Sequence, residues 1–325
     1  MRPTSSLLVT GGAGFIGSAL IRYLLKTKEF NGKILNYDAL TYAGNLENLR
    51  GFQNHPRYRF VQGDIRNQTL VESLILEHEI DTIVHFAAES HVDRSIDHAF
   101  PFFETNVLGT LALLEGVRKY PHVHFHHIST DEVYGSLGES GTFTERSNYR
   151  PNSPYAASKA SSDHIVRSFA NTYGISTTLS HSSNNYGPCQ YPEKFIPLMI
   201  LNSLKRKPLP IYGRGTHIRD WLYVDDHAAA LWCILQKGKV GQTYDIGGKS
   251  EISNLDLLHV ILELLNKERP GDYTSLIRCI QDRPGHDFRY AIDTTKMEKE
   301  LYWKPKTSLK NGLIKTIRWY VEHDP

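Results

Sequence analysis

Short apolar runs alternate with longer segments of helical period in the first half of the chain. Short runs rich in apolar and β-branched residues are typical of buried strands, whereas apolar residues that recur every three or four positions are typical of helices. The short runs predict strands at residues 7–9, 34–37, 58–61, 82–86 and 123–128. Helices are predicted at residues 15–25, 70–76, 102–117 and 155–173. The alternation predicts an α/β fold, a doubly wound parallel (Rossmann) sheet with helices on both faces.

The alternation loosens after about residue 185, where Pro and Gly crowd into residues 186–192 and 208–215. Further helices are predicted at residues 226–236, 254–266 and 309–322. We therefore expect a Rossmann domain over residues 1–185 and a smaller α+β substrate-binding domain over residues 186–325. A segment at about 222–247 is expected to return to the main sheet.

The composition is that of an ordinary globular chain, and it argues against several partners. The chain has 325 residues, of which 40% are hydrophobic and 22% charged, enough for one large domain or two joined ones. The formal charge is +2, and the longest basic run is Lys205-Arg206-Lys207, so nucleic acid is not an expected partner. The apolar run near the N-terminus is too short for a signal peptide or a membrane span, so we expect a cytoplasmic protein with no membrane partner. Three widely separated cysteines predict neither a disulfide framework nor a metal site.

A glycine cluster follows the first predicted strand and opens the first predicted helix. Its glycines permit a tight turn, and they let backbone N–H groups approach a pyrophosphate at the helix N-terminus. The cluster includes Gly11, Gly14 and Gly17, with Phe15 and Ile16 in the first turn of the helix. Its position between a strand and a helix indicates a dinucleotide site.

Asp38 ends the second predicted strand, 21 residues beyond Gly17. An acidic side chain at this place can accept hydrogen bonds from an adenosine ribose, and it would repel a 2′-phosphate. NAD is therefore the expected cofactor, in preference to NADP. Asp64, in a Gly-Asp turn after the third strand, is either a contact to the adenine amino group or a plain turn residue.

Tyr155 and Lys159 are four residues apart at the start of a predicted helix, which places them on one helical face. Ser153 and Pro154 supply the N-cap and first helical residue, and Gly174 the stop. An ammonium beside a phenol favours the phenolate, so we expect Tyr155 to act as a base toward a sugar hydroxyl. Lys159 is also expected to hold the nicotinamide ribose, and Thr130 to bond the reacting hydroxyl.

Asp131 and Glu132 follow Ser129-Thr130 at the end of the fifth predicted strand. Neighbours on a regular strand point to opposite faces, so both carboxylates can serve one sugar only if the strand ends there. Such a pair has a chemical use, because oxidation at C4 of a hexose acidifies the C5 proton and makes the C6 hydroxyl eliminable. One carboxylate takes a proton and one carboxylic acid gives one, and hydride returning to C6 leaves a 4-keto-6-deoxy sugar.

With these motifs the chain resembles the nucleotide-sugar branch of the extended short-chain dehydrogenase/reductase family, most closely the dTDP-glucose 4,6-dehydratases. The resemblance covers nearly the whole chain. It is carried by residues 41–46, 85–95, 129–135, 183–188, 192–194, 219–227 and 283–287. It implies that Asp131 protonates the leaving C6 hydroxyl, that Glu132 is the base at C5 and that Tyr155 is the base at the C4 hydroxyl, assisted by Thr130 and Lys159.

The resemblance also implies ligand contacts elsewhere in the chain. Further cofactor contacts are expected at Thr41, Ile65, Ala87, Asn106 and Asn185. Contacts to the nucleotide sugar are expected at Glu89, His91, Asn184, Glu193, Lys194, Pro210, Tyr212, Arg219, Asn254, Arg283, His286 and Tyr290. Arginine forks suit diphosphate oxygens, and an aromatic ring suits a stacked pyrimidine.

Other functions stay open from the sequence. A UDP-hexose 4-epimerase needs the Tyr and Lys pair but not the two carboxylates, and a regulatory NAD-binding protein should lack part of the pair. A UDP-glucose 4,6-dehydratase shares the chemistry, although the overall match favours dTDP-glucose. The resemblance further implies a homodimer in which the helices at 102–119 and 155–173 form a four-helix bundle, and deoxysugar supply for a rhamnose-type glycan.

Overall fold

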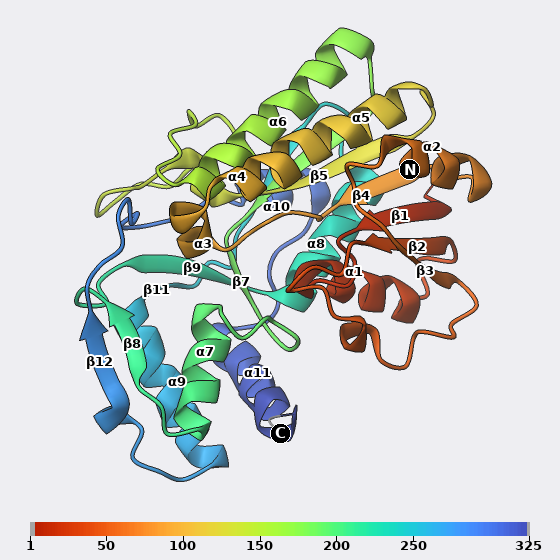
Figure 1. The fold of residues 1–325 in the computed structure, drawn as a ribbon. Coiled ribbons are helices and arrows are strands. Elements are labelled where there is room, and N and C mark those ends of the chain that lie inside the picture. The colour runs from red at the N-terminus through yellow and green to blue at the C-terminus, as the bar shows by residue number, and fades with distance from the viewer. Residues whose placement is uncertain (1–3, 324–325) are drawn as a thin grey trace.

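A seven-stranded parallel sheet forms the larger part of the molecule (Figure 1), in a computed structural model that describes residues 4–323. The strand order is β10-β6-β5-β4-β1-β2-β3. The strands are β1 (Ser6–Thr10), β2 (Lys33–Asp38), β3 (Tyr58–Gln62), β4 (Thr82–His85), β5 (His124–Thr130), β6 (Thr177–Ser182) and β10 (Thr243–Ile246). Every neighbouring pair is parallel, which confirms the predicted doubly wound sheet.

Helices cover both faces of this sheet. On one face lie α1 (Phe15–Lys26) and α8 (Val224–Lys237), and on the other α2 (Gln68–Glu77), α5 (Thr110–Arg118) and α6 (Pro154–Tyr173). Side chains of β1 alternate between the two cores, because successive residues of a strand point to opposite faces. Leu7 and Val9 pack with the α1 and α8 side, and Leu8 with the other. A strand buried on both faces is apolar throughout, which is why this region was readable from the sequence.

The helix predicted at residues 102–117 is broken into three pieces. The chain passes from α4 (Phe100–Phe102) through the π-helical segment η2 (Phe103–Gly109) into α5. Two hydroxyls bond to the Asn106 carbonyl within this segment, from Thr110 Oγ1 at 2.6 Å and Ser162 Oγ at 2.7 Å. Hydroxyl groups that take a helix carbonyl loosen the regular ladder. The spacing of apolar residues alone does not reveal such a π-helical segment.

Strand β6 was not foreseen, because its sequence, Thr-Thr-Leu-Ser-His-Ser, is mostly polar. All six of its residues are nevertheless buried. Thr178 bonds to His126 of β5 at 2.8 Å, and Ser180 bonds to the same ring at 3.1 Å. Polar side chains can fill an interior strand when they satisfy one another. The strand therefore follows a polar pairing that the apolar pattern does not show.

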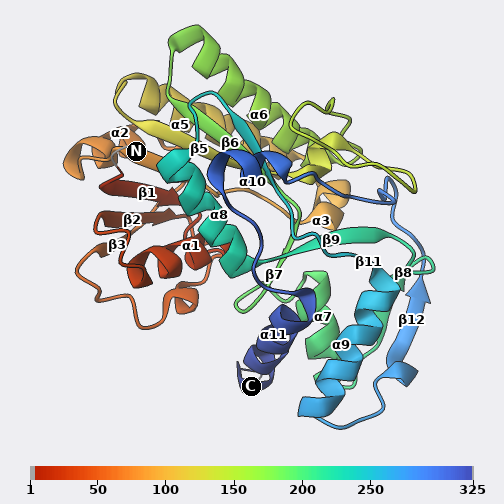
Figure 2. The same cartoon turned by 180° about the vertical axis from the view of Figure 1, so that it is seen from behind.

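The second half of the chain forms a smaller lobe beside the carboxyl end of the sheet (Figures 1 and 2). It holds a three-stranded and a two-stranded sheet, which order as β11-β9-β7 and β12-β8. Their strands are β7 (Asn184–Tyr186), β8 (Leu209–Tyr212), β9 (Ile218–Tyr223), β11 (Glu251–Ser253) and β12 (Ile277–Ile280). An apolar core joins them to α7 (Phe195–Leu204), α9 (Asn254–Glu268) and α11 (Leu309–His323). The last two helices were expected at residues 254–266 and 309–322.

Two later segments lie on the main sheet. Helix α8 packs on α1, and β10 pairs with β6 at the sheet edge, as the segment at 222–247 was expected to do. Helix α10 (Thr295–Leu301), which the sequence did not reveal, packs beside α8 and β10 (Figure 2). Its Met297 and Leu301 belong to the core of the main sheet. Every helix that the structure describes is too short or too polar to cross a membrane.

Candidate active site

Three adjoining cavities form one groove between the main sheet and the smaller lobe. We name them the glycine cavity (about 300 Å³), the central cavity (about 250 Å³) and the arginine cavity (about 220 Å³). Gly11, Ala43, Phe86 and Ala88 line both of the first two. The last two share Ser90, Glu132, Asn184, Glu193 and Lys194. The groove thus runs along the carboxyl ends of the strands, where ligands of open α/β sheets bind.

The glycine turn between β1 and α1 is shaped for close approach. Gly11 has φ +70°, and a Cβ there would lie 2.6 Å from Ala87 N. Gly17 is closed in by the same turn, since a Cβ would lie 2.4 Å from Gly11 O. Only glycine fits both positions, and the helix N-terminus is left open to a phosphate group. The turn therefore fits a dinucleotide.

Asp38 ends β2 in the wall of the glycine cavity. Its Oδ2 accepts from Ala13 N at 2.9 Å and its Oδ1 from Leu40 N at 2.8 Å. Each oxygen retains a lone pair for a ribose hydroxyl. Burial nonetheless raises the pKa of the Asp38 carboxyl above its ordinary value, against these two backbone hydrogen bonds.

Asp64 lines the same cavity but is held by Arg66, with Oδ2 at 2.6 Å from Nη2. Hydrogen bonding to Arg66 lowers the pKa of Asp64. Asp64 thus bonds within its turn and also lines the cavity in which an adenine contact was considered.

Most of the other expected cofactor residues line the groove. Thr41, Ile65 and Ala87 lie in the glycine cavity, and Gly14, Phe15, Ile16 and Asn185 in the central cavity. Asn106 is an exception, because it lies outside these linings and its amide bonds to Glu89 and Ser158. Asn106 thus supports the loop that carries Glu89. Glu89, which was expected to contact the nucleotide sugar, lines the glycine cavity.

Helix α6 presents Tyr155 and Lys159 to the central cavity. The helix begins at Pro154, Ser153 Oγ accepts from Ala156 N, and Gly174 ends the helix in the left-handed conformation, as predicted. Tyr155 is 9% exposed, and burial followed by the charge of Glu132 raises the pKa of its phenol. A hydrogen bond with Thr130 acts in the opposite direction.

Lys159 is turned toward β5. Its Nζ donates to Ile128 O at 2.7 Å and lies 3.5 Å from His127 Nε2. Burial lowers the pKa of Lys159 to about 8, while the charge of Asp163 raises it. The expectation that Lys159 lowers the pKa of Tyr155 is therefore not met by this arrangement, in which desolvation dominates.

A buried polar network lies behind Lys159, and sequence reasoning missed it. Asp163 is at its centre, with Oδ2 3.0 Å from His181 Nε2 and Oδ1 3.2 Å from His127 Nε2. Tyr149 donates to Asp163 at 2.7 Å, and Ser129 at 3.0 Å. Asp163 lies one helical turn beyond Lys159, so the i, i+4 spacing was the available signal.

The network reaches the turn that carries Asp131 and Glu132 through Tyr134. His181 Nδ1 is 3.0 Å from Asp245 Oδ1, and Tyr134 donates to the same oxygen at 3.0 Å. Tyr134 belongs to the 3₁₀ turn η3 (Asp131–Tyr134). The network thus fixes both the turn that carries Asp131 and the helix that carries Lys159.

Strand β5 ends at Thr130, and η3 begins at Asp131. Thr130 Oγ1 accepts from Glu132 N and caps this turn. Gly135 follows with φ +84°. The break confirms the geometric requirement drawn from the sequence, and both Asp131 and Glu132 line the central cavity.

The two carboxyls have different surroundings. Asp131 is 1% exposed, and burial together with the charges of Glu132 and Asp220 holds its pKa well above the ordinary value. Its Oδ2 is buried and bonds to no described residue. Burial also raises the pKa of Glu132, but Arg283, Arg219 and Lys194 oppose that rise. Asp131 is therefore suited to give a proton and Glu132 to take one.

The arginine cavity is lined by both polar and apolar side chains, and Arg219 and Arg283 are among them. Arg219 is held by the carbonyls of Ile218 at 2.8 Å and Asp287 at 2.9 Å, and it lies 4.3 Å from the centre of the Tyr290 ring. Arg283 pairs with Asp93 at 3.2 Å. The remaining expected residues are in the same lining, namely His91, Asn184, Glu193, Lys194, Pro210, Tyr212, Asn254 and His286.

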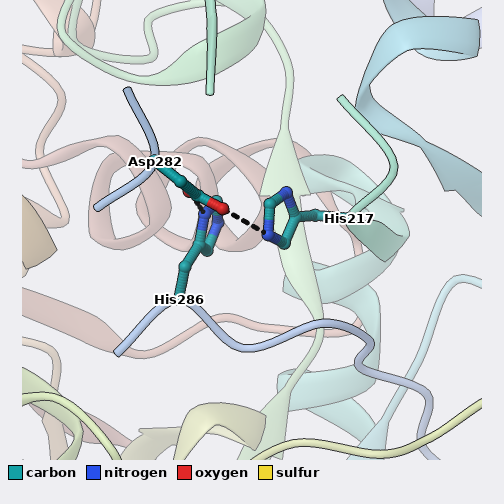
Figure 3. Close-up of side chains that lie close together, drawn as sticks. All are labelled: His217, Asp282 and His286. Carbon is teal, nitrogen blue, oxygen red and sulfur yellow. Dashed lines mark hydrogen bonds and ion pairs between the residues drawn. The ribbon is translucent and has the colours of Figure 1, made fainter. Parts of the chain in front are cut away.

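His217, Asp282 and His286 form a cluster at the edge of this cavity (Figure 3). Asp282 contacts both rings, with Oδ2 3.2 Å from His217 Nε2 and Oδ1 2.6 Å from His286 Nδ1. The rings are stacked, with centres 3.6 Å apart and planes 17° from parallel. Lone pairs in nearly parallel planes do not converge on one ion, so this geometry does not favour a metal site. The cluster instead holds the turn that carries Arg283.

Fold and site together place the chain in a class. The glycine turn lies at one end of the groove, and helix α6 places Tyr155 and Lys159 at the centre of the groove. Together with the parallel sheet, this arrangement is that of the dinucleotide-dependent short-chain dehydrogenases/reductases. The chain belongs to the GDP-mannose 4,6 dehydratase family, whose model matches residues 8–316.

Known proteins resemble the chain over nearly its whole length. A probable dTDP-glucose 4,6-dehydratase of Sinorhizobium fredii is 51% identical, over 98% of this chain and 93% of that protein. The structure of DesIV, a dTDP-glucose 4,6-dehydratase of Streptomyces venezuelae with NAD and TYD bound, is 46% identical with a TM-score of 0.92, over 98% and 97% of the chains. A UDP-glucose 4-epimerase of Thermotoga maritima with UDP-glucose is 29% identical with a TM-score of 0.88, over 98% and 99%.

Proposed function

We propose that this chain is a dTDP-glucose 4,6-dehydratase that uses NAD and forms dTDP-4-dehydro-6-deoxy-glucose. The observation that carries this proposal is the placing of Asp131 and Glu132 with Tyr155 in one cavity, at the centre of a groove whose glycine turn fits a dinucleotide. The 51% identity to a probable enzyme of this name supports the same activity.

The glycine turn and Asp38 would hold the adenosine diphosphate half of NAD, and Lys159 and Asn185 would lie toward its nicotinamide half. Bound NAD supplies a hydride acceptor for C4 and the hydride that ends on C6. Burial of Thr130 and Tyr155 excludes water from the oxidised centre, since they are 8% and 9% exposed.

The protein side chains move the protons of the reaction. Tyr155, in its phenolate form, takes the proton of the C4 hydroxyl, and Glu132 takes the C5 proton made acidic by the C4 ketone. Asp131, kept protonated by burial, gives its proton to the C6 hydroxyl, which leaves as water. Glu132 then returns its proton to C5.

Arg219 and Arg283 are suited to the diphosphate of the substrate, since both present guanidinium groups to the arginine cavity. Tyr212 offers an aromatic face to the base. Asn184 is placed at the junction of the central and arginine cavities, and its buried Oδ1 bonds to no described residue. These contacts orient the sugar toward Asp131 and Glu132.

A UDP-hexose 4-epimerase is the nearest alternative function. The epimerase of known structure has the same fold, but its identity is 29% against 46% for the dehydratase. An epimerase has no use for a protonated carboxyl beside a second carboxylate, and a non-catalytic regulator has no use for the complete set. Recognition of thymine in preference to uracil rests on the relatives.

The test is incubation with NAD and either dTDP-glucose or UDP-glucose, followed by identification of the product. We expect a 4-keto-6-deoxy sugar, with dTDP-glucose the better substrate. A 4-epimer would replace the dehydratase proposal by the epimerase one. Tight NAD binding without turnover of either sugar would favour the regulator.

We also propose a homodimer through a four-helix bundle made by the η2–α5 segment and α6. Large apolar side chains are exposed on these elements, at Phe103 (38%), Leu108 (54%) and Tyr173 (48%). Burying them against a second copy would contribute about 1.5–3 kcal/mol for each side chain. By the same family resemblance we place the enzyme in the cytoplasm, supplying a deoxysugar for a rhamnose-type glycan.

A further inference from the structure

At the end of each turnover the proposed reaction leaves two side chains in a protonation state that differs from the starting one. Tyr155 has gained the proton of the C4 hydroxyl, and Asp131 has lost the proton that left with the C6 oxygen as water. Glu132 is unchanged, because it returns to C5 the proton that it took. The site therefore works again only after one proton moves, in effect, from Tyr155 to Asp131.

Thr130 lies between these two groups. It lines the central cavity together with Tyr155, and hydrogen bonding by Thr130 lowers the pKa of the Tyr155 phenol against the effect of burial. Thr130 Oγ1 is 3.4 Å from Asp131 Oδ1, to which it donates. A hydroxyl can accept one proton while it gives up another, so a chain of phenol, hydroxyl and carboxyl conducts a proton with no net change in the middle group.

The surroundings favour this short path over exchange with solvent. Thr130 is 8% exposed and Asp131 is 1% exposed. Lys159, the other polar neighbour on α6, directs its Nζ to Ile128 O. A route through Lys159 would lead into the buried network around Asp163, away from Asp131.

We propose that the Thr130 hydroxyl relays a proton from Tyr155 to Asp131 at the end of each turnover, so that Asp131 is protonated again before the next C6 hydroxyl leaves. The inference rests on the proposed function. In the relay one O–H bond forms on Thr130 as the Tyr155 O–H bond breaks, and the former Thr130 proton forms the O–H bond of Asp131. The relay thus protonates Asp131 and deprotonates Tyr155 again. Both side chains are then ready for the next turnover without an external acid or base.

The experiment compares the first turnover with later ones by rapid quench, in the native enzyme, Thr130→Val and Thr130→Ser. Valine keeps the branched shape and removes the hydroxyl, whereas serine keeps the hydroxyl. We expect Thr130→Val to form one equivalent of product per site and then to slow about 100-fold, the range for loss of a proton-transfer group. Added imidazole should speed the slow phase by carrying protons from solvent. The native enzyme and Thr130→Ser should show no such burst.

A purely positioning role for Thr130 predicts another result. Thr130→Val would then slow the first and later turnovers equally, without a burst or an imidazole effect, and the relay would be overturned. If that variant fails to fold or to react, a pH indicator in weakly buffered native enzyme decides. The relay predicts no transient proton release during the first turnover, and release of one proton per site would overturn it. Absence of a 4-keto-6-deoxy product from the native enzyme would refute the proposed function itself.

Discussion

Asp131 and Glu132 are neighbours in the chain, yet their surroundings separate their acid strengths. Asp131 is buried among further carboxyls, whereas Glu132 faces the cations of Arg283, Arg219 and Lys194. The first arrangement holds a proton, and the second holds a negative charge ready to accept one. Burial and charge thus support the proposed division of labour between the two residues, independently of the family resemblance.

We predict that Glu132→Gln keeps the fold and NAD binding but abolishes exchange of the C5 proton with solvent. Glutamine has nearly the same shape and cannot act as the base. Exchange into the sugar in deuterated water, followed by mass spectrometry, gives the measurement. The matched variant Glu145→Gln, near Asp245 and outside the groove linings, should leave exchange intact. Undiminished exchange in Glu132→Gln would place the base elsewhere.

The placing of the candidate catalytic residues was predictable from the sequence where it depends on neighbouring residues. The spacing of Tyr155 and Lys159 and the end of β5 before Asp131 depend on neighbouring residues, and both were foreseen. The direction of the Tyr155 pKa was not, because it depends on desolvation and on Glu132, 23 positions away in the sequence. The hydrogen bonds by which the Asn106 amide holds the Glu89 backbone were likewise not foreseen, because they join distant segments.

At the scale of elements, the strands with apolar runs were foreseen and β6 was not. Its buried Thr178, Ser180 and His181 are satisfied by residues of β5, α6 and β10, which a single stretch of sequence does not display. The break at η2 has the same origin, since Ser162 of α6 supplies one of its hydrogen bonds. Contacts between distant elements decide such features.

The pairing of His181 with Asp163 and Asp245 predicts a pH-dependent stability. These carboxylates raise the pKa of the buried His181 to about 9, above the ordinary 6.5. Its contribution to stability is therefore complete below about pH 6.5 and is lost as the pH rises through about 9. We expect the free energy of unfolding to fall by on the order of 1–3 kcal/mol across this window, measured by urea titration. The decline should flatten in His181→Gln, and an unchanged slope would contradict it.

The turn that carries Arg283 gives another prediction. His217→Phe keeps a ring that can stack on His286 but removes the contact to Asp282. Loss of one such bond costs about 1 kcal/mol, so the Kd for thymidine diphosphate should rise about fivefold. Calorimetry with thymidine diphosphate measures the effect, and the Kd for NAD serves as the control. An unaltered nucleotide Kd would mean that the turn is rigid without His217.

At the scale of the whole molecule, the groove depends on two lobes whose sequences interleave. Strand β10 and helices α8 and α10 lie on the main sheet, although they follow β7 in the chain. Glu193 and Lys194, at the junction of the central and arginine cavities, come directly before α7 of the smaller lobe. The return of the segment at 222–247 was expected from the sequence, whereas α10 was not.

The proposed dimer predicts a specific effect of charge. Leu108→Glu places a carboxylate on the exposed apolar surface of η2 and should convert the dimer to monomer at micromolar concentration, as measured by sedimentation. Val240→Glu is a matched control, because Val240 is 55% exposed against 54% for Leu108 and lies between α8 and β10. A native chain that sediments as a monomer would refute the dimer, and dimeric Leu108→Glu would refute this interface.

The polar network behind Lys159 also sets a limit on redesign for heat resistance. Replacing a buried ion pair by well-packed apolar residues is often stabilising. Asp163, His127 and His181 would be obvious targets for such a replacement. Here the same groups position Lys159 and the η3 turn, so we expect a variant stabilised in this way to have a lower turnover rate. Stabilising substitutions are better placed among the aliphatic side chains packed between α1 and α8, because these lie on the helices rather than in the groove linings.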